Sequence, residues 1–261
     1  MEKLSVVIIT KNEENNIGRC LKSVEWADEI IVVDSGSTDK TAEICRAFKV
    51  SFFEREWQGF GAAKAYAVSK ANNDWILSID ADEVVSPNLK KEIISLLENT
   101  VHKAGYRIRF ELFYLEKKIH FSGVRNEYHL RLFDRRHGGF AETIIHEGIT
   151  VDGDIGVLNS PIFHYSYPSV STYLDKLSSY SQLAAKKKLE SGKYVTLPGV
   201  ILRAIFTFIR NYFLLGGILD GRAGFVFTLN SAISTYFNYL LLWEQKYKRN
   251  NNYDKNNMID I

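Results

Sequence analysis

The residues best suited to chemistry form two acidic clusters, each of which directly follows a short apolar run. Asp80, Asp82 and Glu83 follow the residues WILSI, and Asp34 follows the residues IIVV. Alternation along an extended chain places Asp80 and Asp82 on the same side. Two carboxylates held that close repel each other unless a cation lies between them, and hard oxygen ligands suit Mg²⁺ or Mn²⁺. We therefore predict a site for Mn²⁺ or Mg²⁺ at Asp82 and Asp80, where the metal would neutralise a diphosphate.

Asp34 opens a polar turn in the segment VVDSGSTDKT. At the end of a buried strand, its carboxylate would accept hydrogen bonds from a nucleotide base or ribose, while the turn supplies backbone N–H groups. The alternative is a turn that only caps the following helix, because Asp, Ser and Gly are the usual residues of such turns. The segment by itself fits both interpretations.

These clusters need a sheet that holds them at one edge. Residues 4–9 and 30–33 are continuous β-branched runs, which are typical of strands covered on both faces of a parallel sheet. A helical pattern lies between them and the alternation then continues, with a helix near 39–48, a strand at 50–54, a helix near 61–71 and a strand at 74–79. This order predicts a doubly wound α/β fold, whose ligand crevice lies at the carboxyl ends of the strands.

The following segments change character. Ser86 and Pro87 predict the start of a helix, with Ser86 as the cap and Pro87 in the first turn. Residues 105–165 alternate and are rich in aromatic side chains, which predicts additional strands joined by polar loops. Residues 170–191 carry apolar side chains at helical spacing and predict an amphipathic helix.

The C-terminal third contains two strongly apolar stretches within residues 198–243. Arg203 and Arg210 interrupt the first stretch, and a charge at the centre of a membrane-spanning helix costs roughly 2.5–3.5 kcal/mol. Residues 184–210 also carry an excess of five positive charges. The pattern favours amphipathic helices in the interface of an anionic membrane surface over a simple span, and core helices or a subunit interface are the alternative. The polar residues 248–261 are expected to be disordered.

Composition narrows the class of protein. The chain has 261 residues, of which 46% are hydrophobic and 25% charged, which excludes a collagen-like, mostly disordered or polytopic membrane protein. A formal net charge of +2 is too balanced for a dedicated binder of nucleic acid. Cys20 and Cys45 lack metal-binding spacing and are expected to be reduced core residues. No signal peptide is recognised, so we expect a cytoplasmic protein.

Three segments, SVVIITKNEE, VVDSGSTDKT and LSIDADE, together resemble the inverting glycosyltransferases of family 2. The segments GFGAAKAYAV, HLRLF, HEG, FHYS and LDGRAGF extend the resemblance to a subgroup that acts on the lipopolysaccharide inner core as a β-1,4-glucosyltransferase. The resemblance implies a GT-A catalytic domain over residues 1–168, with a nucleotide-binding half at 1–95 and an acceptor half at 96–168. Residues 169–247 would then form a helical, membrane-associating extension.

The resemblance also implies roles for individual residues. Thr10, Glu13 and Asp34 would contact the nucleoside of the donor. Asp80 would meet ribose and metal, and Asp82 would be the principal metal ligand. Lys64 stands where many relatives have Arg, and its ammonium would hold a phosphate as a point charge. His164, in FHYS, either completes the metal shell or is a packed, hydrogen-bonded side chain.

Inversion requires a base that takes the proton of the acceptor hydroxyl as this attacks the anomeric carbon. Relatives often use an Asp in a Glu-Asp pair, which this chain lacks downstream; it has His146 and Glu147 in IIHEG instead. We predict Glu147 as the base, and His146 either orients its carboxylate or serves as the base itself. Asp134 and Glu142 are the rivals.

The predicted activity is transfer of a hexosyl group, glucosyl by resemblance, from a UDP-sugar to a lipid-linked glycan on the inner face of the cytoplasmic membrane. A sugar nucleotidyltransferase is one alternative, but the chain lacks a Gly-rich, basic loop after its first strand. A non-catalytic nucleotide-sugar-binding membrane module is another, and the acidic residues named above weigh against it.

Overall fold

The computed structural model describes residues 2–99, 103–124, 127–140, 148–167 and 170–257. The chain divides into two compact units. Unit 1 comprises Met1–Leu112 and Asn126–Ser166, and unit 2 comprises Phe113–Arg125 and Tyr167–Ile261. Residues 113–125 thus group with unit 2, although they lie between the two segments of unit 1 in the sequence.

The first half of unit 1 follows the predicted alternation of strands and helices. Its elements are β1 (Leu4–Thr10), α1 (Ile17–Val24), β2 (Glu29–Asp34), α2 (Thr41–Arg46), β3 (Ser51–Glu54), α3 (Phe60–Ser69), β4 (Trp75–Asp80), β5 (Glu83–Val85) and α4 (Pro87–Glu98). The Ser86 hydroxyl accepts a hydrogen bond from the Leu89 N–H at 3.2 Å, which confirms the predicted start of α4.

The remaining strands are β6 (Gly105–Tyr114), β7 (Lys117–Lys118), β8 (Glu127–Asp134), β9 (Gly138–Phe140), β10 (Ile149–Val151) and β11 (Ile155–Tyr167). The main sheet has the order β3-β2-β1-β4-β8-β6-β11-β5, and β9 pairs with β10 in a small second sheet. Strands β1 to β4 run parallel to one another, whereas β8 is antiparallel to β4 and to β6.

The parallel strands are buried on both faces. Along β1, Val6 and Ile8 belong to a core shared with α1 and α4, whereas Val7 and Ile9 belong to a second core that includes residues of α3. All seven residues of β1 are buried, as the continuous apolar run predicts. Cys20 and Cys45 are buried free thiols, as predicted.

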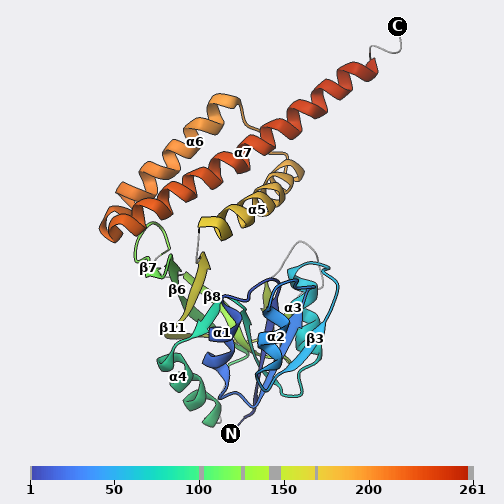
Figure 1. The fold of residues 1–261 in the computed structure, drawn as a ribbon, viewed down its shortest axis with the longest axis vertical. Helices are drawn as coiled ribbons and strands as arrows, with labels where there is room; N and C mark the ends of the chain where they lie inside the picture. The colour runs from blue at the N-terminus through green and yellow to red at the C-terminus, as the bar shows by residue number, and fades with distance from the viewer. Residues whose placement is uncertain (1, 100–102, 125–126, 141–147, 168–169, 258–261) are drawn as a thin grey trace. The chain divides into compact units, whose positions relative to one another are not determined.

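Unit 2 is largely helical. Its elements are β7, α5 (Val170–Glu190), α6 (Leu197–Ile209), the π-helical η1 (Arg210–Leu214), the 3₁₀-helical η2 (Gly217–Asp220) and α7 (Gly221–Asn257). Helices α6 and α7 lie side by side, and α5 packs against α7 (Figure 1). Helix α7 continues to Asn257, so residues 248–257 are helical where composition predicted disorder. The difference has a physical reason, because extending an existing helix needs no new nucleus.

Hydrogen bonds tie the segment 113–125 to the helices of unit 2. The Asp220 carboxylate accepts the backbone N–H groups of His120 and Phe121, at 3.1 and 2.9 Å. The hydroxyl groups of Ser122 and Thr228 form a hydrogen bond at 3.3 Å, and both residues are buried. These contacts explain why the segment belongs to unit 2 although it interrupts unit 1 in the sequence.

Candidate active site

The carboxyl ends of β1, β2 and β4 bring three of the predicted residues to one edge of the sheet. Thr10 stands opposite Asp34 in the register of β1 and β2, and Ile9 stands opposite Asp80 in the register of β1 and β4. This edge is where ligands bind in open α/β sheets. The predicted sheet edge therefore exists, and it carries Thr10, Asp34 and Asp80.

Asp34 organises the turn that follows it. Its carboxylate accepts the backbone N–H groups of Gly36 and Ser37, at 3.1 and 2.8 Å, and also the Ser37 hydroxyl at 2.5 Å. Gly36 has a φ of +81°, a value that favours glycine. Helix α2 begins beyond this turn, and the Asp39 carboxylate, not Asp34, binds Thr41 in its first turn.

The first loop lies beside this turn. The Glu13 N–H donates to the Thr41 hydroxyl at 2.8 Å, and its carboxylate accepts the side-chain amide of Asn16 at 2.6 Å. The Thr10 hydroxyl is buried and lacks a hydrogen-bond partner within the described part of the chain. Buried polar atoms are rarely left unpaired, so an orphaned hydroxyl at this edge is a natural contact for a ligand.

Asp80 is held by two cations. Its Oδ1 lies 2.7 Å from the Lys64 ammonium, and its Oδ2 lies 3.1 Å from Nη2 of Arg131. Burial alone would raise the pKa of Asp80, but Lys64 and Arg131 outweigh it and hold that pKa well below its usual range. Asp80 is therefore ionised, and both of its oxygens are engaged by positive charge.

Arg131 and Glu83 complete this cluster, and sequence reasoning assigned neither a role. Nη2 of Arg131 also lies 2.6 Å from Glu83 Oε1, and Glu83 Oε2 accepts the Asp80 N–H at 2.9 Å. The Glu83 side chain is only 1% exposed. Burial raises the pKa of Glu83 to about 7, with Arg131 opposing the rise and Asp80 adding to it. Glu83 thus bridges the backbone of the acidic turn to Arg131 on β8.

Asp82 lies beside His164. Nε2 of His164 is 3.5 Å from Asp82 Oδ2, because β11 pairs with β5 and sets His164 opposite Glu83. Burial lowers the pKa of His164, but the hydrogen bond and charge of Asp82 outweigh it and raise the pKa above its ordinary value. The raised pKa favours the protonated imidazole, so His164 must lose its proton before Nε2 can bind a metal. The Asp82 carboxylate is an oxygen ligand of the kind that divalent cations prefer.

The ligand set is small. Among the described residues, no group of three or more His, Cys, Asp and Glu side chains is arranged to hold a metal. Mg²⁺ is usually bound by one or two carboxylates together with substrate phosphates and water. The Asp82 carboxylate fits that pattern, whereas the structure places Asp80 with Lys64 and Arg131.

The predicted base lies outside the described residues, as do its neighbour His146 and its rival Glu142. Asp134, the other rival, is described: it stands opposite Trp75, at the start of β4, while Asp80 is at the end of that strand. Five residue steps separate the two ends, or roughly 16 Å along a strand. The Asp134 carboxylate is also bound by Arg136 at 2.6 Å. Asp134 is therefore not part of this site.

Comparison with known proteins places the chain in a class. It matches the family described as "Glycosyl transferase family 2" over residues 5–140, and it therefore belongs to that family. It is 31% identical to an uncharacterized glycosyltransferase of Rickettsia typhi, over 100% of this chain and 93% of the relative. The match makes the protein a member of a glycosyltransferase family and confirms the predicted GT-A fold, and the structure shows the predicted C-terminal helical extension.

A second relative carries a more specific name. The chain is 28% identical to the lipopolysaccharide core biosynthesis glycosyltransferase LpsC of Rhizobium meliloti, over 93% of this chain and 92% of the relative. Among solved structures, TarS of S. aureus is similar with a TM-score of 0.47 and 15% identity, over 90% of this chain and 91% of that one.

Proposed function

We propose that this glycosyltransferase moves a hexosyl group, glucosyl by resemblance, with inversion from a UDP-sugar to a lipid-linked glycan such as the lipopolysaccharide inner core. The observation that carries the proposal is the edge where Thr10, Asp34 and the acidic turn of β4 converge. The edge offers acceptors for a nucleoside and a cation-rich cluster beside a carboxylate–imidazole pair. Such a site suits a nucleoside diphosphate attached to a sugar.

The residues divide the work by their chemistry. The unpaired Thr10 hydroxyl and the Asp34 turn would bind the nucleoside, with Glu13 holding the first loop. Lys64 would contact the diphosphate while it remains paired with Asp80. Asp82 and His164 would hold Mn²⁺ or Mg²⁺, which when bound supplies positive charge to the leaving diphosphate. Asp80, fixed by Lys64 and Arg131, is expected to contact ribose and to approach the metal only if an ion pair opens.

The chemical step needs a base on the opposite side of the sugar from the departing UDP. Glu147 is proposed to take the proton of the acceptor hydroxyl while that oxygen forms its bond to the anomeric carbon. The bond from the anomeric carbon to the diphosphate oxygen breaks at the same time, and the electron pair leaves with UDP. His146 would orient the carboxylate.

The acceptor and the place of action are inferred from the relative and from unit 2. LpsC is named for lipopolysaccharide core biosynthesis, and it matches nearly the whole chain. One helical stretch, Leu197–Leu214, is long and apolar enough to cross a membrane by length and composition, and only 11% of it is buried. Arg203 and Arg210 lie within it, so we propose peripheral binding to an anionic membrane surface on the cytoplasmic side.

The function is tested by incubating the full-length protein with UDP-glucose and Mn²⁺ and measuring the release of UDP by chromatography. We expect metal-dependent hydrolysis without acceptor and faster release with lipopolysaccharide core acceptor. Asp82→Asn should abolish the metal-dependent turnover, because Asn keeps the shape but loses the charge. The matched control Asp152→Asn changes an exposed carboxylate directly after β10 and should leave turnover intact. Full activity in Asp82→Asn across a Mn²⁺ titration would refute the metal assignment.

A further inference from the structure

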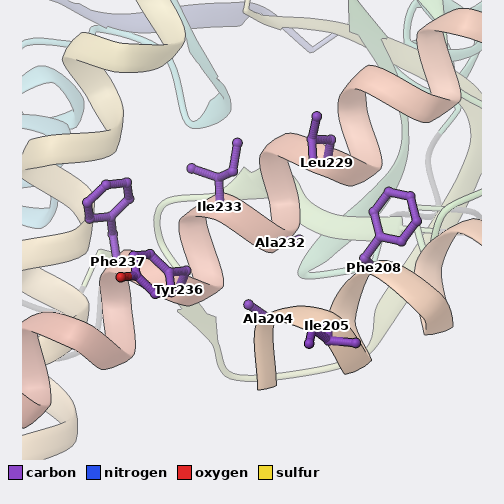
Figure 2. Close-up of a pocket in the computed structure, with 8 residues that line it drawn as sticks. All are labelled: Ala204, Ile205, Phe208, Leu229, Ala232, Ile233, Tyr236 and Phe237. Carbon is purple, nitrogen blue, oxygen red and sulfur yellow. The ribbon is translucent and has the colours of Figure 1, made fainter. Parts of the chain in front are cut away.

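An apolar groove runs between α6 and α7 in unit 2. It has a volume of about 460 Å³ and is open along one side. Figure 2 shows side chains from both helices along it. The lining consists of apolar and aromatic residues only: Ala204, Ile205, Phe208, Leu229, Ala232, Ile233, Tyr236 and Phe237. The two alanines leave the space that larger residues would fill.

The groove opens into a wider apolar surface on α6 and η1. Ile205, which lines the groove, is 51% exposed, and Ile201 and Ile209 lie one turn before and after it at 50% and 45%. Phe213 and Leu214 continue the stripe and are 56% and 72% exposed. Soluble surfaces rarely carry an apolar patch of this extent, so the patch marks a binding site.

Positive charge gathers at one end of the groove. The Arg203 guanidinium lies 5.0 Å from the centre of the Tyr239 ring, and the Lys188 ammonium lies 5.1 Å from it. Tyr239 follows the lining residue Tyr236 by one helical turn. From residue 197 to residue 243, Asp220 is the only acidic residue, and its carboxylate accepts N–H groups from His120 and Phe121. The occupant therefore meets cations at one end and hydrocarbon along the rest.

We propose that this groove binds a hydrocarbon chain of an anionic membrane lipid, with the lipid headgroup at Lys188 and Arg203. The apolar lining accepts the chain, and the two cations attract a phosphate or carboxylate. The inference rests on the membrane partner of the proposed function, and it adds a defined site for a single lipid chain. A general apolar contact with the bilayer would need no groove.

The test uses cis-parinaric acid, a fluorescent long-chain fatty acid, with the full-length protein. Saturable fluorescence enhancement is expected for the native sequence. Ala204→Phe fills the groove without reducing its apolar character and should weaken the affinity by about tenfold or more. Leu202→Phe is the matched control, because Leu202 is 65% exposed on the same helix and does not line the groove. It should bind as the native protein does.

A second variant leaves the lining of the groove unchanged. Arg203→Gln combined with Lys188→Gln removes the headgroup cations and should lower the affinity for the fatty acid, and the loss of their contacts with Tyr239 is followed separately by the melting temperature. Equal affinity in Ala204→Phe, with a native melting temperature, would overturn the proposal. So would a dimer by light scattering that Ala204→Phe disrupts, because the occupant would then be a second copy of the chain.

Sedimentation with vesicles of phosphatidylglycerol and phosphatidylcholine separates the groove proposal from the membrane binding on which it rests. If the native protein sediments with the vesicles but takes up no fatty acid, the membrane partner stands and the groove proposal fails. If it does neither, both fail. Vesicle binding together with saturable fatty-acid binding that is lost in Ala204→Phe supports both.

Discussion

At the scale of single residues, the carboxylates of the acidic turn are paired with cations before any donor arrives. Asp80 contacts both Lys64 and Arg131, and Glu83, whose pKa is raised to about 7, contacts Arg131. Burying ions costs several kcal/mol each unless every one is paired. The turn therefore has a fixed shape, and Asp82 projects from a rigid support toward His164.

Arg131 should be important for stability as well as for geometry. Arg131→Ala leaves Glu83 buried beside Asp80 without its partner, and breaking a buried ion pair in this way costs about 3–5 kcal/mol. Urea unfolding followed by circular dichroism measures the change. The unfolding midpoint of Arg131→Lys should lie between those of the native protein and Arg131→Ala. Lys keeps the charge but has no planar group that can bind both carboxylates. Arg107→Ala, on an exposed position of β6, is the control, and an equal midpoint for Arg131→Ala and Arg107→Ala would contradict the prediction.

Glu147 is the residue whose replacement should separate binding from chemistry. Glu147→Gln is expected to preserve affinity for the UDP-sugar and to lower kcat by about 10²–10⁴, the usual contribution of a positioned general base. Isothermal calorimetry with UDP and single-turnover transfer measure the two quantities. Glu142→Gln is the matched comparison. A near-native kcat for Glu147→Gln would transfer the role to Glu142 or His146.

The sequence predicts the site residues that directly follow a strand. It does not predict those that strand pairing brings into the site. Asp34 and Asp80 are visible because polar residues end continuous apolar runs. For His164 two roles were open, a metal ligand or a packed side chain. The pairing of β11 with β5 sets it beside Asp82. Glu83 was visible in the acidic cluster but received no role, and Arg131 was not singled out. Both roles depend on β8 lying antiparallel to β4, and the alternating pattern of residues 105–165 does not specify its neighbours.

At the scale of elements, the link between α6 and α7 depends on glycines. Gly216 has a φ of +75° and Gly221 a φ of +62°. Gly217 and Gly224 pack so closely that a Cβ on Gly224 would overlap the Gly217 carbonyl and lie 2.7 Å from Cβ of Asp220. The segment LDGRAGF therefore has a structural role, which is to close the hairpin and present Asp220 to the chain at 120–121.

Gly224→Ala tests this role. The added methyl group meets backbone on one side, so the helices must move apart, and overpacking of this kind costs typically about 1–3 kcal/mol. A lower melting temperature is expected by calorimetry. Gly139→Ala is the control, because no atom lies within 4 Å of the position of its Cβ. Equal melting temperatures for both variants would show that the close approach of Gly224 to Gly217 does not affect stability.

The helices and strands of the first 98 residues follow from the sequence because each carries a local signal. The helical spacing of Ile17, Cys20 and Leu21 and the cap at Ser86 act within a few residues. The membership of residues 113–125 in unit 2 has no such signal. It arises from hydrogen bonds to residues about a hundred positions later, which no local pattern encodes.

At the scale of the whole molecule, charge is unevenly distributed along the chain. Lys186, Lys187 and Lys188 lie in the last turns of α5, immediately before the apolar helices. Changing all three to Gln should reduce sedimentation with anionic vesicles, since each Lys near such a surface contributes about 1 kcal/mol. The loss should be larger at low salt, because screening weakens the native interaction at high salt.

The control replaces an equal charge in unit 1, at Lys3, Lys90 and Lys91, all of which are exposed. Vesicle binding should then be retained. Hydrolysis of the UDP-sugar in water should be unaffected by the α5 substitutions, whereas transfer to a lipid-linked acceptor should fall. Equal sedimentation of both triple variants would assign α5 a role other than membrane attraction.

The interleaving of the two units along the chain limits how this enzyme can be recombined. Because residues 113–125 are synthesised long before Asp220, the ribosome releases a segment whose partners do not yet exist. A chimaera that joins a foreign C-terminal half at residue 167 would leave the N–H groups of His120 and Phe121 to whatever aspartate the new half offers. A chimaera that keeps these hydrogen bonds must transfer both segments of unit 2, residues 113–125 and 167–261. Unit 2 therefore cannot be exchanged as a single C-terminal segment.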